Sequence, residues 1–339
     1  ATVATVATVA TVFTFENAPI DIIAKYKDLK QSDTSTGKAG LFVAEGPETI
    51  KMLLQSNTTI ESLLLKTSVY DRLKGNIEER ASRCPTNPFA IVLVNGASNF
   101  TEHVGYTARG ALAVGSIPTH RNLHWLRENV LLAKNKGVQW RILAIDGSNN
   151  PANIGNIIRS AKALEIDAVL LSERCCDPWL RRAVRVSMGH CFNIPIIQCT
   201  CLKTDLLHLQ ETDLVVCYSA VVTKNAALVG TGANKATPFV SKWCVVVGAE
   251  HEGVSKEILA LTNKVKIPMS KGVDSLSITA ATSILLAHFR QTNDANGGGN
   301  TMAVGGGGSG SKGGGRTELL WCCLGLALGV VVGQRIAKR

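Results

Sequence analysis

The chain has 339 residues, of which 45% are hydrophobic and 18% are charged. At roughly 150 residues per domain this length predicts about two domains, and the apolar share is ample for a core in each. A disordered or fibrous protein is therefore excluded for most of the length. Lys and Arg number 36 against 26 Asp and Glu, so the formal net charge is +10. Such an excess fits a polyanionic partner or an anionic membrane surface.

The positive charge is unevenly distributed along the chain. Residues 1–120 carry no net charge, residues 121–296 carry +6, and residues 297–339 carry +4. The basic excess therefore belongs to the second half of the chain and to its tail.

The ten cysteines are scattered or adjacent, without a C-x-x-C pair or a histidine at zinc-finger spacing. This pattern indicates neither a disulfide framework nor a structural metal site. None of the seven histidines stands in a metal-like arrangement. We therefore expect reduced thiols, an intracellular compartment and no bound metal.

The two ends of the chain have unusual compositions. Residues 1–15 open with four Ala-Thr-Val repeats and are expected to be a low-complexity terminus, and they lack the arginines of a transit peptide. Residues 297–315 contain eleven glycines and are expected to be a flexible linker. The tail at 316–339 holds a charge-free run, 319–334, that resembles a membrane anchor, although at about 1.5 Å per residue it spans about 24 Å. The alternative is an apolar helix that packs on the protein or on a partner.

Between these ends, apolar strand patterns alternate with helical patterns. The first unit, 16–120, is predicted to hold strands near 40–46, 60–65, 90–94 and 110–114 and helices near 47–55 and 69–80. A helix at 123–136, with Gly137 as its C-cap, leads into the second unit, 121–296. That unit is predicted to hold strands at 140–145, 168–171, 214–218 and 243–247, with a last helix at 277–289. Continuous apolar strands separated by helices favour an α/β fold with a parallel sheet.

Three polar or glycine-rich loops follow strands of the second unit, where open α/β sheets usually bind ligands. The first, 150–159, places Asn153 and Arg159 across the start of a helix, although asparagines there commonly act as helix caps. The second, 247–255, is glycine-rich at both ends, and the third, 267–278, runs from Ile-Pro-Met to Ser-Leu-Ser. None matches a dinucleotide or P-loop phosphate motif.

Taken together, the three loops resemble the signature motifs of the SpoU (TrmH) family of RNA ribose 2'-O-methyltransferases, in the SPOUT superfamily. The resemblance covers roughly residues 137–290, and residues 16–120 more weakly resemble the family's N-terminal substrate-binding domain. It implies a SPOUT-type parallel sheet with a C-terminal trefoil knot, plus a small N-terminal α/β domain that binds RNA. It also implies S-adenosyl-L-methionine as cofactor, no metal, and a homodimer.

The resemblance further implies the roles of individual residues. Arg159 would assist the attacking 2'-hydroxyl, with Asn153 and Glu250 shaping its surroundings. Because a guanidinium is effectively always protonated, stabilisation of a developing alkoxide is at least as credible as proton abstraction. The methyl-donor pocket would be lined by residues of the second and third loops, namely Gly248, Ala249, Glu250, Gly253, Ile267, Met269, Ser275, Leu276 and Ser277. Ser277 departs from the family, which usually has Asn there.

Three arginines are candidates for RNA contact. Arg181, Arg182 and Arg185 are predicted to lie on a helix that starts at Asp177-Pro178. The alternative is a solvated face, or one ion-paired with Glu173 and Asp177.

The resemblance implies methylation of a ribose 2'-hydroxyl, most specifically of guanosine in large-subunit rRNA. The alternatives are a tRNA ribose 2'-O-methyltransferase and a non-catalytic, RNA-binding ribosome assembly factor with the same fold. For a eukaryotic member we expect a mitochondrion or another organelle, with the cytoplasm as the alternative, and membrane attachment through residues 319–334.

Overall fold

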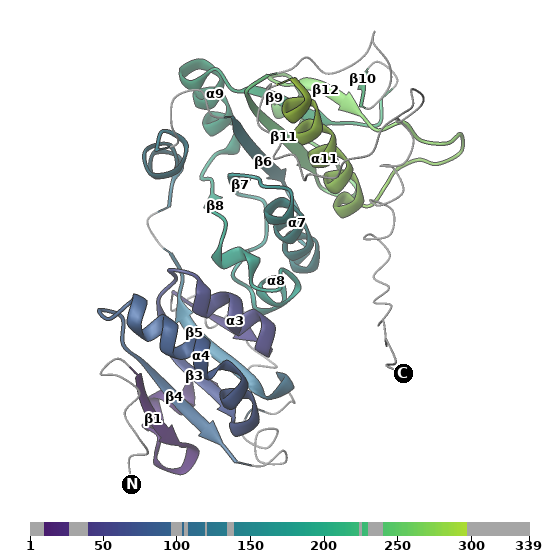
Figure 1. Ribbon diagram of the computed structural model, residues 1–339. Coiled ribbons are helices and arrows are strands. Elements are labelled where there is room, and N and C mark those ends of the chain that lie inside the picture. Colours follow the sequence, from purple (N-terminus) through teal and green to yellow (C-terminus); the bar gives the residue numbers. More distant parts are fainter. Residues whose placement is uncertain are drawn as a thin grey trace, which may run out of the picture.

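The computed structural model describes residues 10–26, 40–95, 104, 108–118, 121–133, 139–223, 226–229 and 240–296. These residues form two β-sheets, each flanked by helices, with the N-terminal unit below the second unit in Figure 1. The α/β class expected from the sequence is therefore confirmed.

The N-terminal sheet has the strand order β1-β4-β3-β5-β2. Its strands are β1 (Ala10–Thr14), β2 (Leu41–Glu45), β3 (Ile60–Lys66), β4 (Phe89–Val94) and β5 (Ala111–Ser116). Its helical segments are η2 (Phe15–Asn17), α1 (Ile20–Ala24), α3 (Pro47–Gln55), α4 (Thr67–Arg83) and η3 (Ala108–Gly110). β1, β4 and β3 are parallel, whereas β5 is antiparallel to both of its neighbours. The four strands and two helices predicted here are confirmed.

The low-complexity terminus was expected to extend to residue 15, and the structure corrects that boundary. Ala10–Thr14 form edge strand β1, which pairs with β4 from Ala10 opposite Phe89 to Thr14 opposite Leu93. Ala10 and Val12 of the fourth repeat are buried. Thr and Val favour strands because their β-branched side chains suit a pleated surface, so a repetitive composition did not exclude a strand.

The helix predicted at 123–136 is shorter and less regular than expected. Asn122 caps α6 (Leu123–Leu126) by accepting a hydrogen bond from the Trp125 amide at 2.8 Å. The chain then widens into a π-helical turn, η4 (Arg127–Leu131), in which the Leu132 amide donates to the Arg127 carbonyl at 2.8 Å. Residues 134–138, including the expected C-cap, lie outside the described residues.

The second sheet has the order β10-β12-β9-β11-β6-β7-β8, and all of its pairings are parallel. Its strands are β6 (Trp140–Asp146), β7 (Ala168–Leu171), β8 (Ile196–Gln198), β9 (Val216–Ala220), β10 (Ala227–Leu228), β11 (Lys242–Gly248) and β12 (Asn263–Lys266). Its helical segments are α7 (Pro151–Ala163), α8 (Arg181–Val186), η5 (His190–Phe192), α9 (Leu202–Asp213), α10 (Lys256–Leu259) and α11 (Ile278–Asn296). The expected parallel sheet is confirmed, although β9 begins at Val216 because Leu214 ends α9 in a left-handed conformation.

Helices cover both faces of this sheet. Leu143 and Ile145 of β6 pack into one hydrophobic core with α7, α8 and α11, while Ile142 and Ala144 pack into another with α6, α9 and α10. Alternate residues of one strand point to opposite faces, so β6 is buried on both. This arrangement explains why its sequence is continuously apolar. The trefoil knot stays a prediction.

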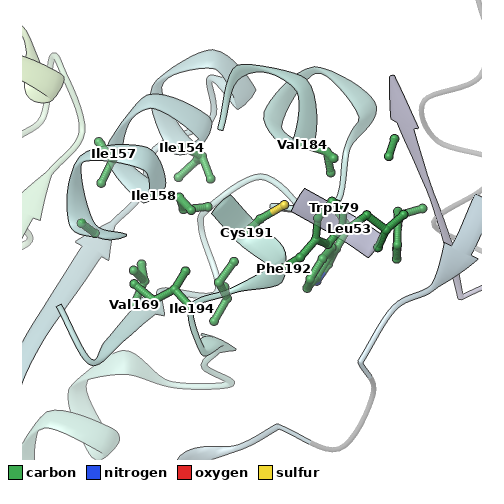
Figure 2. Close-up of a cluster of buried hydrophobic side chains, with 14 of the residues drawn as sticks. Leu53, Ile154, Ile157, Ile158, Val169, Trp179, Val184, Cys191, Phe192 and Ile194 are labelled. Carbon is green, nitrogen blue, oxygen red and sulfur yellow. The ribbon is translucent and has the colours of Figure 1, made fainter. Parts of the chain in front are cut away.

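The two units meet through α3, β2 and the segment around α8 and η5. Phe42 of β2 lies 5.7 Å from Trp179 and 5.0 Å from Phe192, measured between ring centroids. Figure 2 shows Leu53 of α3 beside Trp179 and Phe192 at one end of this hydrophobic cluster. The contact is therefore a continuous apolar core between the units.

Replacement of Trp243 by alanine is expected to lower the free energy of unfolding by about 3–5 kcal/mol, as for other buried large side chains. Trp243 is fully buried in β11, and its ring lies 5.3 Å from that of Phe289 of α11. Urea denaturation followed by circular dichroism measures the change. The half-buried Trp125 provides the control, because its replacement removes less buried surface. An equal loss for both variants would contradict this account of the core.

Candidate functional site at the carboxyl edge of the second sheet

The first loop leaves β6 and enters α7. Asn150 caps this helix by accepting a hydrogen bond from the Ala152 amide at 2.9 Å, and Pro151 occupies the first turn. The helix-cap interpretation therefore holds for Asn150. Asn153 instead donates from Nδ2 to Oε1 of Glu250 in the second loop, at 2.7 Å.

The second loop, 248–255, turns back sharply on itself at the end of β11. The Gly253 amide donates to the Ala249 carbonyl at 2.9 Å, which leaves Glu250, His251 and Glu252 exposed at the tip. A Cβ on Gly248 would lie 1.9 Å from the Gly253 carbonyl carbon, and Gly253 itself has a φ of +68°. Both glycines are therefore required by the path of the backbone.

An ion-pair network lies beside these two loops. Arg174 donates from Nη2 to Oδ1 of Asp146 at 2.7 Å and from Nη1 to Oε2 of Glu252 at 3.2 Å. Oδ2 of Asp146 accepts from the Ser255 amide at 2.8 Å. Burial alone would raise the pKa of Asp146, but these hydrogen bonds and the Arg174 charge hold that pKa below its usual value.

The third loop follows β12 and leads into α11. Ile267 and Met269 are half-buried, whereas Ser275, Leu276 and Ser277 are exposed. The Ser277 hydroxyl accepts from the Ala280 amide at 3.3 Å, so Ser277 acts as the helix cap. Asn and Ser are both good caps, which gives a structural reason why Ser can replace the family's usual Asn.

The three loops lie at one edge of the sheet. They follow β6, β11 and β12, and in a parallel sheet all strands end at the same edge. The structure brings Asn153 and Glu250 together as a hydrogen-bonded pair. Arg159 lies further along α7, exposed and without a hydrogen bond or ion pair to any described residue.

The three candidate RNA-binding arginines lie on α8, which begins at Arg181 and not at Asp177-Pro178 as predicted. Asp177 instead accepts from the Trp179 amide at 2.9 Å, which forms a local turn before the helix. Nη1 of Arg181 lies 3.4 Å from one oxygen of Glu45, and Nη1 of Arg185 lies 3.6 Å from the other. Both arginines are thus ion-paired, but with Glu45 and not with Glu173 or Asp177 as the alternative expected, and their contact with RNA stays a prediction.

Arg182 differs from its neighbours on α8. It is exposed and makes no ion pair within the described part of the chain. Arg182 is therefore the member of the trio whose charge stays available to a ligand.

Sequence reasoning missed Asp146, Arg174 and Glu252. Asp146 carried a usable signal, because a carboxylate that ends a buried parallel strand faces the ligand-binding edge. Arg174 carried none, because it lies 28 residues from Asp146 and 78 from Glu252.

Stability is expected to fall as the pH drops below about 6.5, the usual histidine value. Burial, helped by the charges of Arg159 and Lys162, lowers the pKa of His190, and burial lowers the pKa of His288. At a pH below about 6.5 the two histidines are protonated in the unfolded chain but stay neutral in the folded chain. Their contribution to the free energy of unfolding is therefore present above the pKa of the unfolded chain, and it is lost as the pH falls towards their lower pKa values in the folded chain. Urea denaturation at pH 7 and pH 5.5 measures this. The double variant His190→Gln and His288→Gln should flatten the dependence, and an unchanged slope would contradict the assignment.

No group of three or more His, Cys, Asp or Glu within the described ranges could hold a metal ion. The eight described cysteines are free. No described helix is long and apolar enough to cross a bilayer, and the anchor expected at 319–334 lies outside the described residues.

Comparison with known proteins shows which proteins this chain resembles in sequence and in fold. Residues 141–287 match the SpoU rRNA Methylase family. The chain is 33% identical over 156 residues to an uncharacterized tRNA/rRNA methyltransferase of Mycobacterium bovis, across 46% of this chain and 52% of the relative. It thus spans about half the length of that relative.

Two solved structures share the fold. The SpoU methyltransferase AviRb from Streptomyces viridochromogenes, in complex with AdoMet, gives a TM-score of 0.62 at 18% identity over 82% of this chain and 99% of that one. A structure described as an RNA 2'-O ribose methyltransferase gives 0.59 at 20% identity, over 83% of this chain and 98% of that one. Residues 141–287 are therefore similar in sequence to the SpoU methylases, and the chain shares the fold of solved SpoU methyltransferases.

Proposed function

We propose that the protein transfers the methyl group of S-adenosyl-L-methionine to a ribose 2'-hydroxyl of RNA, and that it does so as a homodimer. The observation that carries the proposal is the position of three loops at one sheet edge, where the 2.7 Å hydrogen bond between Asn153 and Glu250 joins the first loop to the second. The family match, the relative named as a tRNA/rRNA methyltransferase and the AdoMet complex of AviRb support it.

The second and third loops fit a nucleoside cofactor. Among the described residues, one backbone-to-backbone hydrogen bond is formed within 267–276, from the Val273 amide to the Ser270 carbonyl at 3.3 Å, so most backbone groups there have no backbone partner in the described part of the chain. Val273 and Leu276 expose apolar side chains beside them, which suits a flat base. S-Adenosylmethionine, when bound, supplies an electrophilic methyl group. We assign its binding to the residues of the two loops, namely Gly248, Ala249, Glu250, Gly253, Ile267, Met269, Ser275, Leu276 and Ser277.

Arg159 is assigned to the substrate hydroxyl. A ribose hydroxyl is a poor nucleophile at neutral pH, so the transition state needs a fixed donor for the developing alkoxide. The exposed side chain of Arg159 makes no ion pair with any described residue, so its charge is available for that role. Asn153 and Glu250 fix each other at the head of the same helix and shape the surroundings of the reacting groups.

Guanosine in large-subunit rRNA is the proposed substrate, with tRNA as the alternative. The test is transfer of labelled methyl from S-adenosylmethionine to total rRNA and total tRNA, followed by mapping of the modified nucleotide. Label at a ribose 2'-oxygen of rRNA is the expected result. Label on protein or DNA but not on RNA would refute the proposal.

The affinity for RNA is expected to depend only modestly on salt concentration. The slope of log K against log salt reports the number of phosphate contacts, and we expect fewer than about five contacts per monomer. Residues 1–120 carry no net charge, and Arg181 and Arg185 are already paired with Glu45. Filter binding over a salt series measures the slope. A steep slope would show that many more cations contact the backbone than this surface offers.

The non-catalytic assembly factor is not favoured by any described feature. Its sequence support was Ser277, which in the structure caps α11 much as Asn would. Calorimetric titration with S-adenosylmethionine separates the two functions, because a non-catalytic module has no need to bind the methyl donor.

A further inference from the structure

Both carboxylate oxygens of Asp146 accept hydrogen bonds from residues that are distant in the sequence. The Asp146 side chain is 2% exposed and ends β6. Oδ1 accepts from Arg174 at 2.7 Å, and Oδ2 accepts from the Ser255 amide at 2.8 Å. A buried carboxylate is costly unless it is paired and hydrogen-bonded, so this geometry is strongly specified.

These contacts tie down the second loop at its beginning, tip and end. Gly248, where the loop begins, stands opposite Asp146 in the pairing of β11 with β6. Glu252 near the tip reaches Arg174 at 3.2 Å, and Ser255 at the end returns to Asp146. The Asp146–Arg174 pair therefore contacts the loop near its tip and at its end, while strand pairing holds its beginning.

The backbone leaves room for this pair. Gly147 has a φ of +84°, and a Cβ there would lie 3.2 Å from Cζ of Arg174. The absence of that side chain lets the guanidinium lie against the end of β6, where it reaches two carboxylates at once. Because both carboxylates neutralise it, Arg174 is unsuited to hold an RNA phosphate.

We infer that Asp146 and Arg174 are positioning residues that hold the second loop in its cofactor-binding conformation. The inference rests on the proposed function, since the loop is assigned there to S-adenosylmethionine. A preorganised loop binds its ligand more tightly because binding then loses less conformational entropy of the loop. Arginine is needed because its planar fork can bridge two acceptors, which a lysine ammonium does less well.

The test compares Arg174→Met with Arg127→Met by calorimetry. Arg127 is a matched control, because it pairs with Asp213 at 2.7 and 3.0 Å. Asp213 ends α9 just before β9 begins, at the opposite edge of the sheet from the loops. The Kd for S-adenosylmethionine should rise about tenfold in Arg174→Met, because binding must then also order the loop. It should stay within about twofold of wild type in Arg127→Met.

Two further readouts separate positioning from general stability. Hydrogen exchange of the Ser255 amide, measured without ligand, should accelerate in Arg174→Met and in Asp146→Asn and stay unchanged in Arg127→Met. The KM for S-adenosylmethionine should rise in Arg174→Met while the KM for RNA does not. Arg174→Lys should restore part of the affinity.

The outcomes distinguish this inference from the proposed function. A wild-type protein that does not bind S-adenosylmethionine would overturn the proposed function. A wild-type protein that binds, with an unchanged Kd in Arg174→Met, would overturn this inference alone. Unchanged exchange of the Ser255 amide in Arg174→Met would overturn it as well, whatever the cofactor affinity.

Discussion

Replacing Arg159 with alanine is expected to lower the rate of methyl transfer by about 10²- to 10³-fold, the usual effect of removing one donor to a developing oxyanion. Arg159→Lys should lose nearly as much, because a flexible ammonium does not reproduce the planar fork of a guanidinium. The measurement is kcat for transfer of labelled methyl to RNA at saturating cofactor.

The loss should occur without unfolding. Arg159 is exposed on α7, and exposed substitutions usually change stability by less than about 0.5 kcal/mol. Lys162→Met is the matched control, since it removes an exposed positive charge less than one turn further along α7. Activity of Arg159→Ala within about threefold of wild type would remove Arg159 from the mechanism, whereas an equal loss in Lys162→Met would point to general electrostatics.

The sequence predicted most of the second sheet because its signals are local. Continuous apolar runs marked β6, β7 and β11, and the polar residues directly after β6 and β11 marked the ligand-binding edge. The pairing of Asn153 with Glu250, 97 residues apart, is consistent with the expectation that the first and second loops meet. That expectation came from the family resemblance and from the rule that parallel strands end at one edge.

The failures of prediction involve partners distant in sequence. Arg181 was matched with nearby carboxylates, but its partner Glu45 lies 136 residues away in the other unit. The contact forms because Phe42, Trp179 and Phe192 bring β2 against α8 and η5, which no local pattern shows. The start of α8 was misplaced for a related reason, since Asp177 caps a local turn instead of the helix.

For Arg159, in contrast, the sequence suggests a role that the contacts of the side chain do not reveal. Its role was predicted from the resemblance, yet nothing in its contacts within the described chain marks it as functional. A side chain reserved for substrate need not have an intramolecular partner, because a permanent ion pair would compete with the ligand. The rates of Arg159→Ala and Arg159→Lys therefore test this role directly.

Gly248→Ala is expected to weaken binding of S-adenosylmethionine by about ten- to a hundredfold. The added Cβ would lie 1.9 Å from the Gly253 carbonyl carbon and 2.1 Å from the Val254 amide nitrogen. These are backbone atoms of the same loop, so the loop must open and lose the 2.9 Å hydrogen bond from Gly253 to Ala249. Forced overpacking costs about 1–3 kcal/mol, and each 1.4 kcal/mol corresponds to about tenfold in affinity.

Alanine substitutions at two other glycines distinguish the steric clash at Gly248 from a general effect of an added methyl group. Gly253→Ala meets no atom within 4 Å, but its φ of +68° disfavours alanine by about 1–2 kcal/mol, so its effect should be smaller. Gly75→Ala lies within α4, has no neighbour within 4 Å and should stabilise the helix slightly without changing cofactor binding. Calorimetric titration of the three variants should give the largest Kd for Gly248→Ala, then Gly253→Ala, then Gly75→Ala. A wild-type Kd in Gly248→Ala would mean that the cofactor does not depend on the closed form of this loop.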